Sequence, residues 1–354
     1  MRRIPLLIAI VATISFAGSF STAKRGATLV FPQDHFEHPS FKTEWWYFTG
    51  NLKSADGREY GYQFTIFRNA VGEQGPMAPR ASAWAARDLL LAHVALTDGV
   101  SKTHRSVERF GRGTRASFSR DPFGVKVEEA RMVRNQEGSY TLSFDADGLG
   151  LSLDVSAVKP RVLQGDHGYS RKGKDPSNAS YYVSFTRMKT EGSISIEGRS
   201  LKVTGTSWMD HEWSTSALDD GQVGWDWFAL HLDDGTDLMI YRLRQADGGA
   251  GPFSSGTVVD ARGRATALHP SEFSLEPTEV WQSPRSKGRY PVAWRVRIPA
   301  QGIDVRVRAR VDDQEMKTSI RYWEGDVGVI GSHGGSGYLE MTGYADALGQ
   351  YLGR

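Results

Sequence analysis

The 354-residue sequence contains no cysteine. Disulfide bonds, thiolate metal sites and a cysteine nucleophile are therefore excluded together, and so is a lipid anchor attached through cysteine. Stability must come from buried apolar surface. A chain of this length can bury enough of it in one large domain or in two domains of ordinary size.

A strong net charge is also missing, because 43 basic residues stand against 41 acidic ones. No block of five or six like charges occurs anywhere. Nucleic-acid binding normally requires a concentrated basic surface that displaces counterions. The composition therefore excludes nucleic acid as a partner and leaves small molecules or proteins.

The longest apolar run lies at the N-terminus. Residues 1–3 form a short basic start, residues 4–16 are almost wholly apolar, and residues 21–23 read Ser-Thr-Ala. The apolar run is shorter than the ~20 residues of a membrane-spanning helix, and the small residues fit a cleavage site. We expect a cleavable signal peptide over residues 1–23 and a periplasmic or secreted protein. An uncleaved N-terminal anchor is the alternative.

Helical patterns are scarce, and only residues 78–96 contain a short run of helix formers. Elsewhere apolar and polar residues alternate with the period of a strand that buries one face, as at 60–66, 294–298 and 305–311. Turn dipeptides separate these runs at Asp56-Gly57, Asp98-Gly99, Glu137-Gly138, Asp147-Gly148, Asp234-Gly235 and Asp247-Gly248. The sequence predicts an antiparallel all-β chain.

The sequence also repeats itself over a long period. Residues 45–48 (WWYF) correspond to residues 225–228 (WDWF), and each is followed by an Asp-Gly turn. Later in each half, residues 203–205 (VTG) correspond to residues 341–343 (MTG). A period this long indicates a duplicated domain rather than a solenoid.

We therefore expect two domains, at residues 24–206 and 207–354. A closed barrel of about eight antiparallel strands removes its sheet edges and is wide enough for one small ligand. Many aromatic residues fall on the predicted inward faces, which favours barrels. A β-sandwich, with its core between two facing sheets, is the alternative.

Four segments carry a resemblance to a known family: residues 44–52 (EWWYFTGNL), 165–173 (GDHGYSRKG), 181–188 (YYVSFTRM) and 208–213 (WMDHEW). They resemble the AttH/CrtC-like family, which includes predicted secreted hydrolases, carotenoid 1,2-hydratases (hydroxyneurosporene synthases) and fungal relatives with pericyclase activity. The resemblance implies two tandem lipocalin-like β-barrels. For the secreted AttH-like branch it also implies an ABC transporter of the lipoprotein-release type as a partner.

The hydratase branch of that family is associated with a His-x-Trp motif and a later Tyr-x-Asp motif. His211 and Trp213 match the first motif. Tyr241 matches the start of the second, but Arg242 and Leu243 follow it, so the expected acid is missing. Protonation of an isolated alkene needs a strong acid beside an aromatic wall, and this departure puts hydratase activity in doubt.

The densest polar cluster is Asp210-His211-Glu212, which lies between Trp208 and Trp213. His211 could exchange a proton while a neighbouring carboxylate fixes its tautomer. The two tryptophans would then contact the ligand. The alternative is a purely structural network that joins the two barrels.

Asp226 lies within an aromatic strand, and alternation places it on the side of Phe228. A carboxyl group in apolar surroundings has a raised pKa, so Asp226 could replace the missing acid. In the alternative reading the cavity lies on the other face, which carries Trp225, Trp227 and His231.

Trp45 and Tyr47, together with Trp225 and Trp227, are candidate walls for a flat ligand. The alternative is that these rings only fill a core. The glycine-flanked loop 165–173 could cover a barrel mouth, or could be a plain surface loop.

No Gly-x-Ser-x-Gly elbow is present, and no residue spacing requires a metal ion or a cofactor. Two hypotheses follow. The first is an exported monomeric carrier for an apolar, lipid or polyene-like molecule. The second is a hydratase-like or hydrolase-like enzyme that uses His211 with Asp210, Glu212 or Asp226, close to Tyr241.

Overall fold

The computed structural model describes residues 20–71, 87–215, 219 and 221–346. Within these ranges the chain forms two antiparallel β-sheets and four short 3-10 helices, as the predicted all-β class requires. The helices are η1 (Gln33–His35), η2 (Gly113–Arg115), η3 (Pro270–Glu272) and η4 (Pro299–Gln301). No helix among the described residues is both long and apolar enough to span a bilayer.

The first sheet has the strand order β4-β3-β2-β1-β13-β12-β9-β8-β7-β6-β5, and β10 and β11 pair with β12. Its strands are β1 (Thr43–Ser54), β2 (Glu59–Ala70), β3 (Asp88–Asp98), β4 (Thr103–Gly111), β5 (Ala116–Arg120), β6 (Phe123–Val127), β7 (Ala130–Arg134), β8 (Tyr140–Ala146), β9 (Leu149–Ala157), β10 (Val162–Leu163), β11 (Tyr169–Arg171), β12 (Ala179–Ile196) and β13 (Arg199–Ser214).

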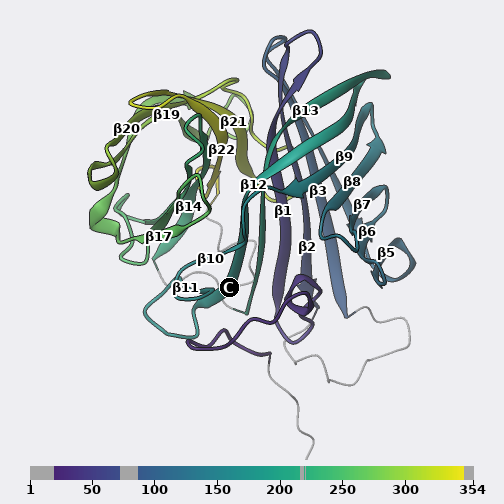
Figure 1. Cartoon of the computed structure of the whole chain (residues 1–354), viewed down its shortest axis with the longest axis horizontal. Helices are drawn as coiled ribbons and strands as arrows, with labels where there is room; N and C mark the ends of the chain where they lie inside the picture. Colours follow the sequence, from purple (N-terminus) through teal and green to yellow (C-terminus); the bar gives the residue numbers. More distant parts are fainter. Residues whose placement is uncertain (1–19, 72–86, 216–218, 220, 347–354) are drawn as a thin grey trace, which may run out of the picture.

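The second sheet has the order β17-β16-β15-β14-β22-β21-β20-β19-β18. Its strands are β14 (Gln222–Leu232), β15 (Asp237–Gln245), β16 (Ser255–Val259), β17 (Ala265–Leu268), β18 (Ser274–Gln282), β19 (Arg289–Ile298), β20 (Ile303–Ala309), β21 (Tyr322–Gly331) and β22 (Gly335–Thr342). Figure 1 looks into its curled ring, with the long strands of the first sheet beside it.

The two sheets share one topology, which supports the predicted duplication. In each sheet the last strand pairs with the first, β13 with β1 and β22 with β14. In each sheet the two edge strands follow one another in the chain, β4 and β5 around η2 and β17 and β18 around η3. This is the arrangement of an up-and-down barrel that is open at one seam.

Strand pairing corrects the second pair of repeated segments. Met341 lies opposite Asp226, and His211 lies opposite Trp46, which is the equivalent of Asp226. The residue that corresponds to Met341 is therefore His211, and residues 203–205 have a different counterpart. The predicted boundary at 206/207 falls inside β13, which pairs with β1 as far as Ser214.

The alternating patterns are confirmed where they predicted a buried face. Tyr60, Tyr62, Phe64 and Ile66 of β2 lie in the core of the first sheet. The equivalent core of the second sheet includes Trp294, Val296, Ile298, Val305 and Val307. Both cores are inside the curled sheets, where apolar side chains on every second residue meet.

The predicted position of the leading aromatics needs a correction. Trp46 and Phe48 fill the first barrel, but Trp45 and Tyr47 point out of it. A separate apolar cluster joins the outer faces of the two sheets, and it includes Tyr47, Trp227 and Tyr241. Strict alternation along β1 and β14 forces this division, because neighbouring residues of a strand face opposite sides.

The turn dipeptides connect consecutive antiparallel strands as predicted. Gly57 and Gly235 occupy equivalent hairpins of the two halves, with φ of 83° and 88°. A side chain disfavours this left-handed backbone, which accounts for glycine at both positions. Residues 78–86 of the candidate helical segment lie outside the described residues, and Asp88–Leu96 belong to strand β3 and not to a helix. Residues 1–19 of the predicted signal peptide also lie outside them.

Candidate active site

A cavity of about 340 Å³ lies between the two sheets, at the level of the aromatic cluster. Its aromatic lining includes Trp45, Tyr47, Phe67, Trp225, Trp227 and Tyr322. The four rings predicted as ligand walls therefore do surround one cavity, but that cavity lies between the barrels and not inside either one. Its volume is in the range of ordinary small-molecule sites.

Strand β13 divides the predicted cluster at residues 210–212 between its two faces. Asp210 and Glu212 line the cavity. His211 points the other way, into the first barrel, where its ring stacks on Trp46 with the centroids 4.8 Å apart. Trp213 shares that inner side and stacks on His38. The pairing of His211 with a carboxylate of residue 210 or 212 is therefore absent, because alternation separates neighbours.

Asp210 is the centre of a hydrogen-bond network in the wall of the cavity that the first sheet forms. Tyr182 donates to Oδ2 at 2.6 Å, and Ser184 and Trp208 donate to Oδ1 at 2.5 and 2.8 Å. Burial raises the pKa of Asp210 to about 7, although these hydrogen bonds oppose the change. Trp208 thus contacts the carboxyl group of Asp210 but is not among the residues that line the cavity.

Glu212 is paired with Lys172, whose ammonium nitrogen lies 3.3 Å from Oε1. Ser180 donates a hydrogen bond to the same oxygen. The hydroxyl of Tyr241 is 3.3 Å from that of Ser170. Tyr241 lines the cavity as well, so this predicted residue and Glu212 share one polar end of it.

The second sheet forms the opposite wall of the cavity. It supplies two acids that the sequence analysis did not single out, Glu324 and Glu340. They are direct cross-strand partners in β21 and β22. Trp225 donates to Oε1 of Glu340 at 2.8 Å, and Tyr47 donates to Oε1 of Glu324 at 2.8 Å. Burial raises the pKa of Glu340 to about 7, helped by the charge of Asp210. Burial also raises the pKa of Glu324 well above its usual value, helped by the charge of Glu340.

The duplication relates the acids of the two walls. Asp210 lies opposite Tyr47 in the pair β13–β1, and Glu340 lies opposite Trp227 in the pair β22–β14. Tyr47 and Trp227 are equivalent residues of the repeat, so Asp210 and Glu340 occupy equivalent positions. The cavity therefore receives one buried carboxyl group from the same place in each half.

The raised pKa of Glu340 predicts that stability falls as the pH rises from 5 to 7. Because the folded protein holds this proton more tightly than the unfolded chain, the stabilisation is complete below the ordinary value of 4.5 and is lost as the pH rises through about 7. We expect Glu340 to contribute about 1–2 kcal/mol of this fall. Urea unfolding at both pH values measures it, and Glu340→Gln should reduce the fall. An equal fall in the variant would contradict the prediction.

Asp226 does not serve this cavity, and the predicted role of a neutral acid does not fit its contacts. It is fully buried inside the second barrel. Arg242 and Arg244 form ion pairs with it at 2.8 and 3.0 Å, and Tyr344 donates to Oδ1 at 2.9 Å. Asp226 therefore has the contacts of a structural residue that is held by two arginines and a tyrosine. The alternative reading, with the cavity on the face of Trp225 and Trp227, is the observed one.

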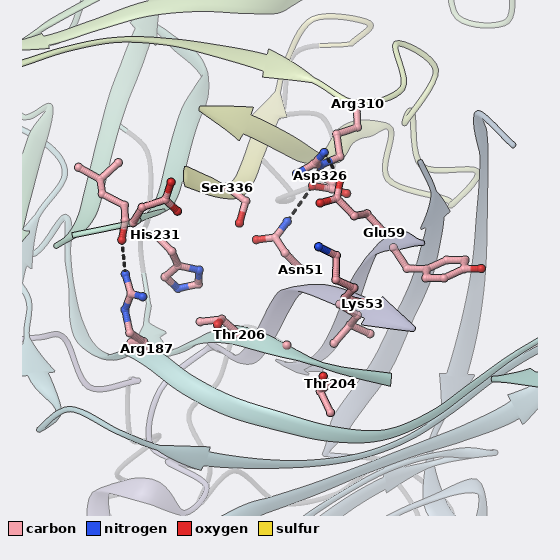
Figure 2. A pocket seen from close by; sticks show the side chains of 15 residues that line it. Asn51, Lys53, Glu59, Arg187, Thr204, Thr206, His231, Arg310, Asp326 and Ser336 are labelled. Atoms are coloured by element: carbon pink, nitrogen blue, oxygen red, sulfur yellow. Dashed lines mark hydrogen bonds and ion pairs between the residues drawn. The ribbon is translucent and has the colours of Figure 1, made fainter. Parts of the chain in front are cut away.

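His231 lies on that same face but belongs to a second cavity, of about 310 Å³, farther along the interface (Figure 2). Burial lowers the pKa of His231 to about 4, so its ring is neutral. The charges around it are largely paired with one another. Arg310 contacts Asp326 at 3.1 Å, and Asn51 donates to the same oxygen of Asp326 at 2.7 Å. Burial raises the pKa of Asp326 to about 7, and its Oδ2 has no hydrogen-bond partner among the described residues. The lining of this cavity is mostly polar, however, so it suits an apolar ligand less well than the aromatic cavity does.

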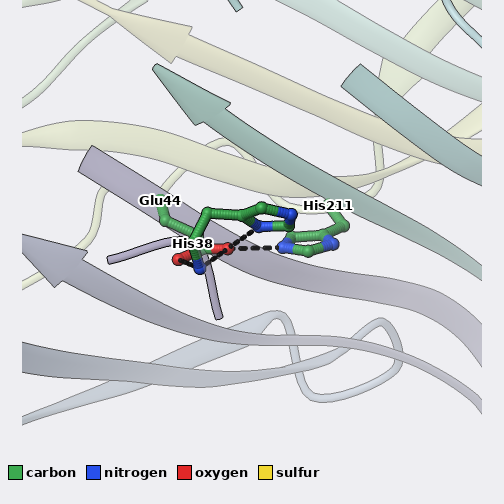
Figure 3. Close-up of side chains that lie close together, drawn as sticks. All are labelled: His38, Glu44 and His211. Carbon is green, nitrogen blue, oxygen red and sulfur yellow. Dashed lines mark hydrogen bonds and ion pairs between the residues drawn. The ribbon is translucent and has the colours of Figure 1, made fainter. Parts of the chain in front are cut away.

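Inside the first barrel, His211 belongs to the group shown in Figure 3. Glu44 Oε1 lies 2.7 Å from His38 Nδ1 and 2.9 Å from His211 Nε2. The three ligand atoms lie within 4.8 Å of one another, a set that a metal ion could use. However, Arg68 forms an ion pair with Oε2 of Glu44 at 2.9 Å. Burial would raise the pKa of Glu44, but the two histidines outweigh it and hold the pKa well below its usual range. The group is therefore a buried network in which Glu44 has hydrogen-bond and ion-pair partners on both oxygens, whereas Nδ1 of His211 has no hydrogen-bond partner among the described residues.

Known proteins resemble this chain over most of its length. The model of the family described as AttH-like matches residues 22–344. The solved structure of an AttH from Nitrosomonas europaea is 34% identical and has a TM-score of 0.82, covering 92% of this chain and 100% of that one. This comparison and the family match confirm the family predicted from the four segments.

Two more distant relatives have enzyme names. Kievitone hydratase from Nectria haematococca is 15% identical with a TM-score of 0.69, over 93% of this chain and 98% of that one, which is a likeness of fold. Dehydratase asqC from Emericella nidulans (strain FGSC A4) is 24% identical over 198 residues, or 54% of this chain. The match spans about half the length of that curated relative, 53%.

Proposed function

This chain belongs to the AttH-like family, and we propose that it is an enzyme that adds water to, or removes it from, a flat, uncharged small molecule bound between its two barrels. The observation that carries the proposal is Glu340, a half-buried carboxyl group with a pKa of about 7 that faces an aromatic cavity. Such a group can give or take a proton near neutral pH, which is what the reaction requires.

The contacts of Glu340 leave part of it available to a ligand. Its Oε1 accepts a hydrogen bond from Trp225, while Oε2 has no hydrogen-bond partner among the described residues. Trp225 and Trp227 form the wall beside it. Their rings provide an apolar surface on which a flat ligand can stack.

The acidic lining favours an uncharged substrate. Asp210, Glu212, Glu324 and Glu340 all line the cavity, and they outnumber its two lysines, Lys42 and Lys172, so an anion is disfavoured. Asp210 faces the cavity from the other sheet and is hydrogen-bonded to the hydroxyl of Tyr182, so it can receive a proton through that hydroxyl. Two groups on opposite walls then permit proton donation and removal within one turnover.

The family supports this reading, because two relatives are named a hydratase and a dehydratase. The predicted histidine mechanism is replaced here. His211 lies on the inner face of β13, behind the wall, so the carboxyl groups take over the proton transfer.

The test is turnover of a panel of flat alkenes and the matching alcohols by the purified protein in water labelled with oxygen-18. Hydration should place the label in the product alcohol, and dehydration should convert the alcohol into an alkene that is lighter by one water; mass spectrometry detects both products. Compounds that bind but are recovered unchanged across the panel would refute the enzyme.

A second candidate function is a carrier of an apolar, lipid or polyene-like molecule. The contacts of Asp210 favour it, because three donors occupy its two oxygens, as in a structural carboxylate. A carrier would release its extracted ligand chemically unchanged. We also propose export by the N-terminal signal and cooperation with an ABC transporter of the lipoprotein-release type. N-terminal sequencing of the protein from a periplasmic fraction tests the export, and co-purification tests the transporter.

A further inference from the structure

Loop 165–173, the glycine-flanked segment of the sequence, places one cation in the cavity. Lys172 follows directly after β11, and its side chain is only 12% exposed. The ammonium group lies over the ring of Tyr241, 4.3 Å from the centroid, and 5.1 Å from that of Tyr182. Both rings line the cavity, as Lys172 itself does. The loop thus contributes a positive charge, in addition to that of Lys42, to a site that is mainly lined by acids and aromatic rings.

The partner of Lys172 leaves its donors only partly used. Glu212 lies 3.3 Å from the ammonium nitrogen, which is longer than a good charge-assisted hydrogen bond. Ser180 also donates to the same oxygen of Glu212, so that oxygen is shared. An ammonium group carries three N–H donors and no acceptor. A ligand oxygen that enters the cavity can therefore bind to Lys172 without breaking its ion pair.

An oxygen that carries partial negative charge suits this position best. An ammonium group between aromatic rings, away from bulk water, attracts such an oxygen more strongly than it would in solvent. A carboxylate or phosphate would also meet the four acids of the cavity, which disfavours full charge. A neutral carbonyl group has the required partial charge and fits between flat walls.

We propose that Lys172 binds the carbonyl oxygen of the substrate, so that the enzyme acts on flat ketones whose reacting carbons lie next to that carbonyl. The reaction rests on the proposed function, whereas the binding does not. In the dehydration direction, the C–H bond beside the carbonyl breaks and its proton passes to a carboxylate. The electron pair forms an enolate whose oxygen is held by Lys172. The enolate then collapses to the alkene, and the departing hydroxyl takes a proton from a neutral carboxyl group and leaves as water.

Two probes of the same shape test the binding. Trans-chalcone is a flat ketone conjugated with an alkene, and trans-stilbene is a flat alkene without the carbonyl. Quenching of tryptophan fluorescence reports both, because Trp45, Trp225 and Trp227 line the cavity. We expect Lys172→Met to weaken chalcone binding about tenfold, as the loss of a charge-assisted hydrogen bond predicts, and to leave stilbene binding unchanged. Lys189→Met removes an exposed lysine from β12 and is the matched control.

Lys172→Met leaves the buried Glu212 without its cation, which could itself disturb the site, so a second variant controls for this effect. Lys172→Met with Glu212→Gln removes the ion pair as a unit, and it should show the same selective loss of chalcone binding. Infrared spectroscopy of carbonyl-labelled chalcone should give a lower stretching frequency in the wild type than in either variant. Absence of chalcone binding by the wild type, equal binding by wild type and variants, or an equal loss for both probes would overturn the proposal. Selective loss without any hydration would support the binding and refute only the proposed reaction.

Discussion

Replacing Glu340 by glutamine is expected to lower kcat/KM for the hydration or dehydration reaction by about 10²- to 10⁴-fold, the usual contribution of general acid–base catalysis. Glutamine keeps the acceptor for Trp225 Nε1–H but has no proton of suitable acidity to transfer. The fold and the binding of a flat ligand should therefore persist. Initial rates on the substrate found in the oxygen-18 screen, with fluorescence titration of the same ligand, measure the two effects separately.

The pH profile identifies the residue more sharply than the rate alone. The wild type should lose activity as the pH rises through about 7, because Glu340 then gives up its proton. That limb should disappear from the residual activity of the variant. Glu279→Gln changes an exposed glutamate of β18 and is the control for the substitution itself. A fall of less than tenfold for Glu340→Gln, with the high-pH limb intact, would assign the proton transfer elsewhere.

The fold could be predicted because its signals are local. Alternation along β2, β19 and β20 needs only the apolar residues of each strand, and the turn dipeptides mark where the strands reverse. The sequence of each half does not reveal which faces are covered by the other half. Trp45 and Tyr47 therefore seemed to belong to a barrel interior, whereas the structure places them between the two outer faces.

The candidate site could be predicted only in part, for a physical reason. Asp210 and Glu212 stand out because they are charged residues close to tryptophans, and both line the cavity. Glu324 and Glu340 come from strands that are distant in sequence, and only pairing brings them together. Glu340 becomes recognisable once the repeat is aligned by strand pairing, since it then corresponds to Asp210. The structure also shows that Asp226 and Glu340 have different environments. Two arginines are paired with Asp226, whereas tryptophans line the cavity beside Glu340.

Replacing Arg68 by alanine is expected to lower the free energy of unfolding by about 3–5 kcal/mol, since it leaves a buried carboxylate without its cation. Arg68 is only 1% exposed and forms ion pairs with Glu44 at 2.9 Å and with Asp88 at 2.8 Å. It also donates to the backbone carbonyls of His38 and Phe41, at 2.9 and 2.7 Å. The substitution therefore disconnects the segment before β1 from the barrel. Urea unfolding followed by tryptophan fluorescence measures the loss.

The exposed pair Arg295–Asp304 provides the matched control, because both side chains are about half exposed, 49% and 47%. Arg295→Ala should change the free energy of unfolding very little, because the ion pair is exposed and water screens it. The double change Arg68→Met with Glu44→Gln removes the charge pair together and should recover much of the loss, since no charge is then buried alone. If Arg68→Ala costs no more than Arg295→Ala, the prediction is wrong, and a protonated His38 then supplies the positive charge beside Glu44. Hydrogen bonds to Asp34 and Glu44 outweigh burial and raise the pKa of His38. The stability of the variant would in that case fall as the pH rises and His38 loses its proton.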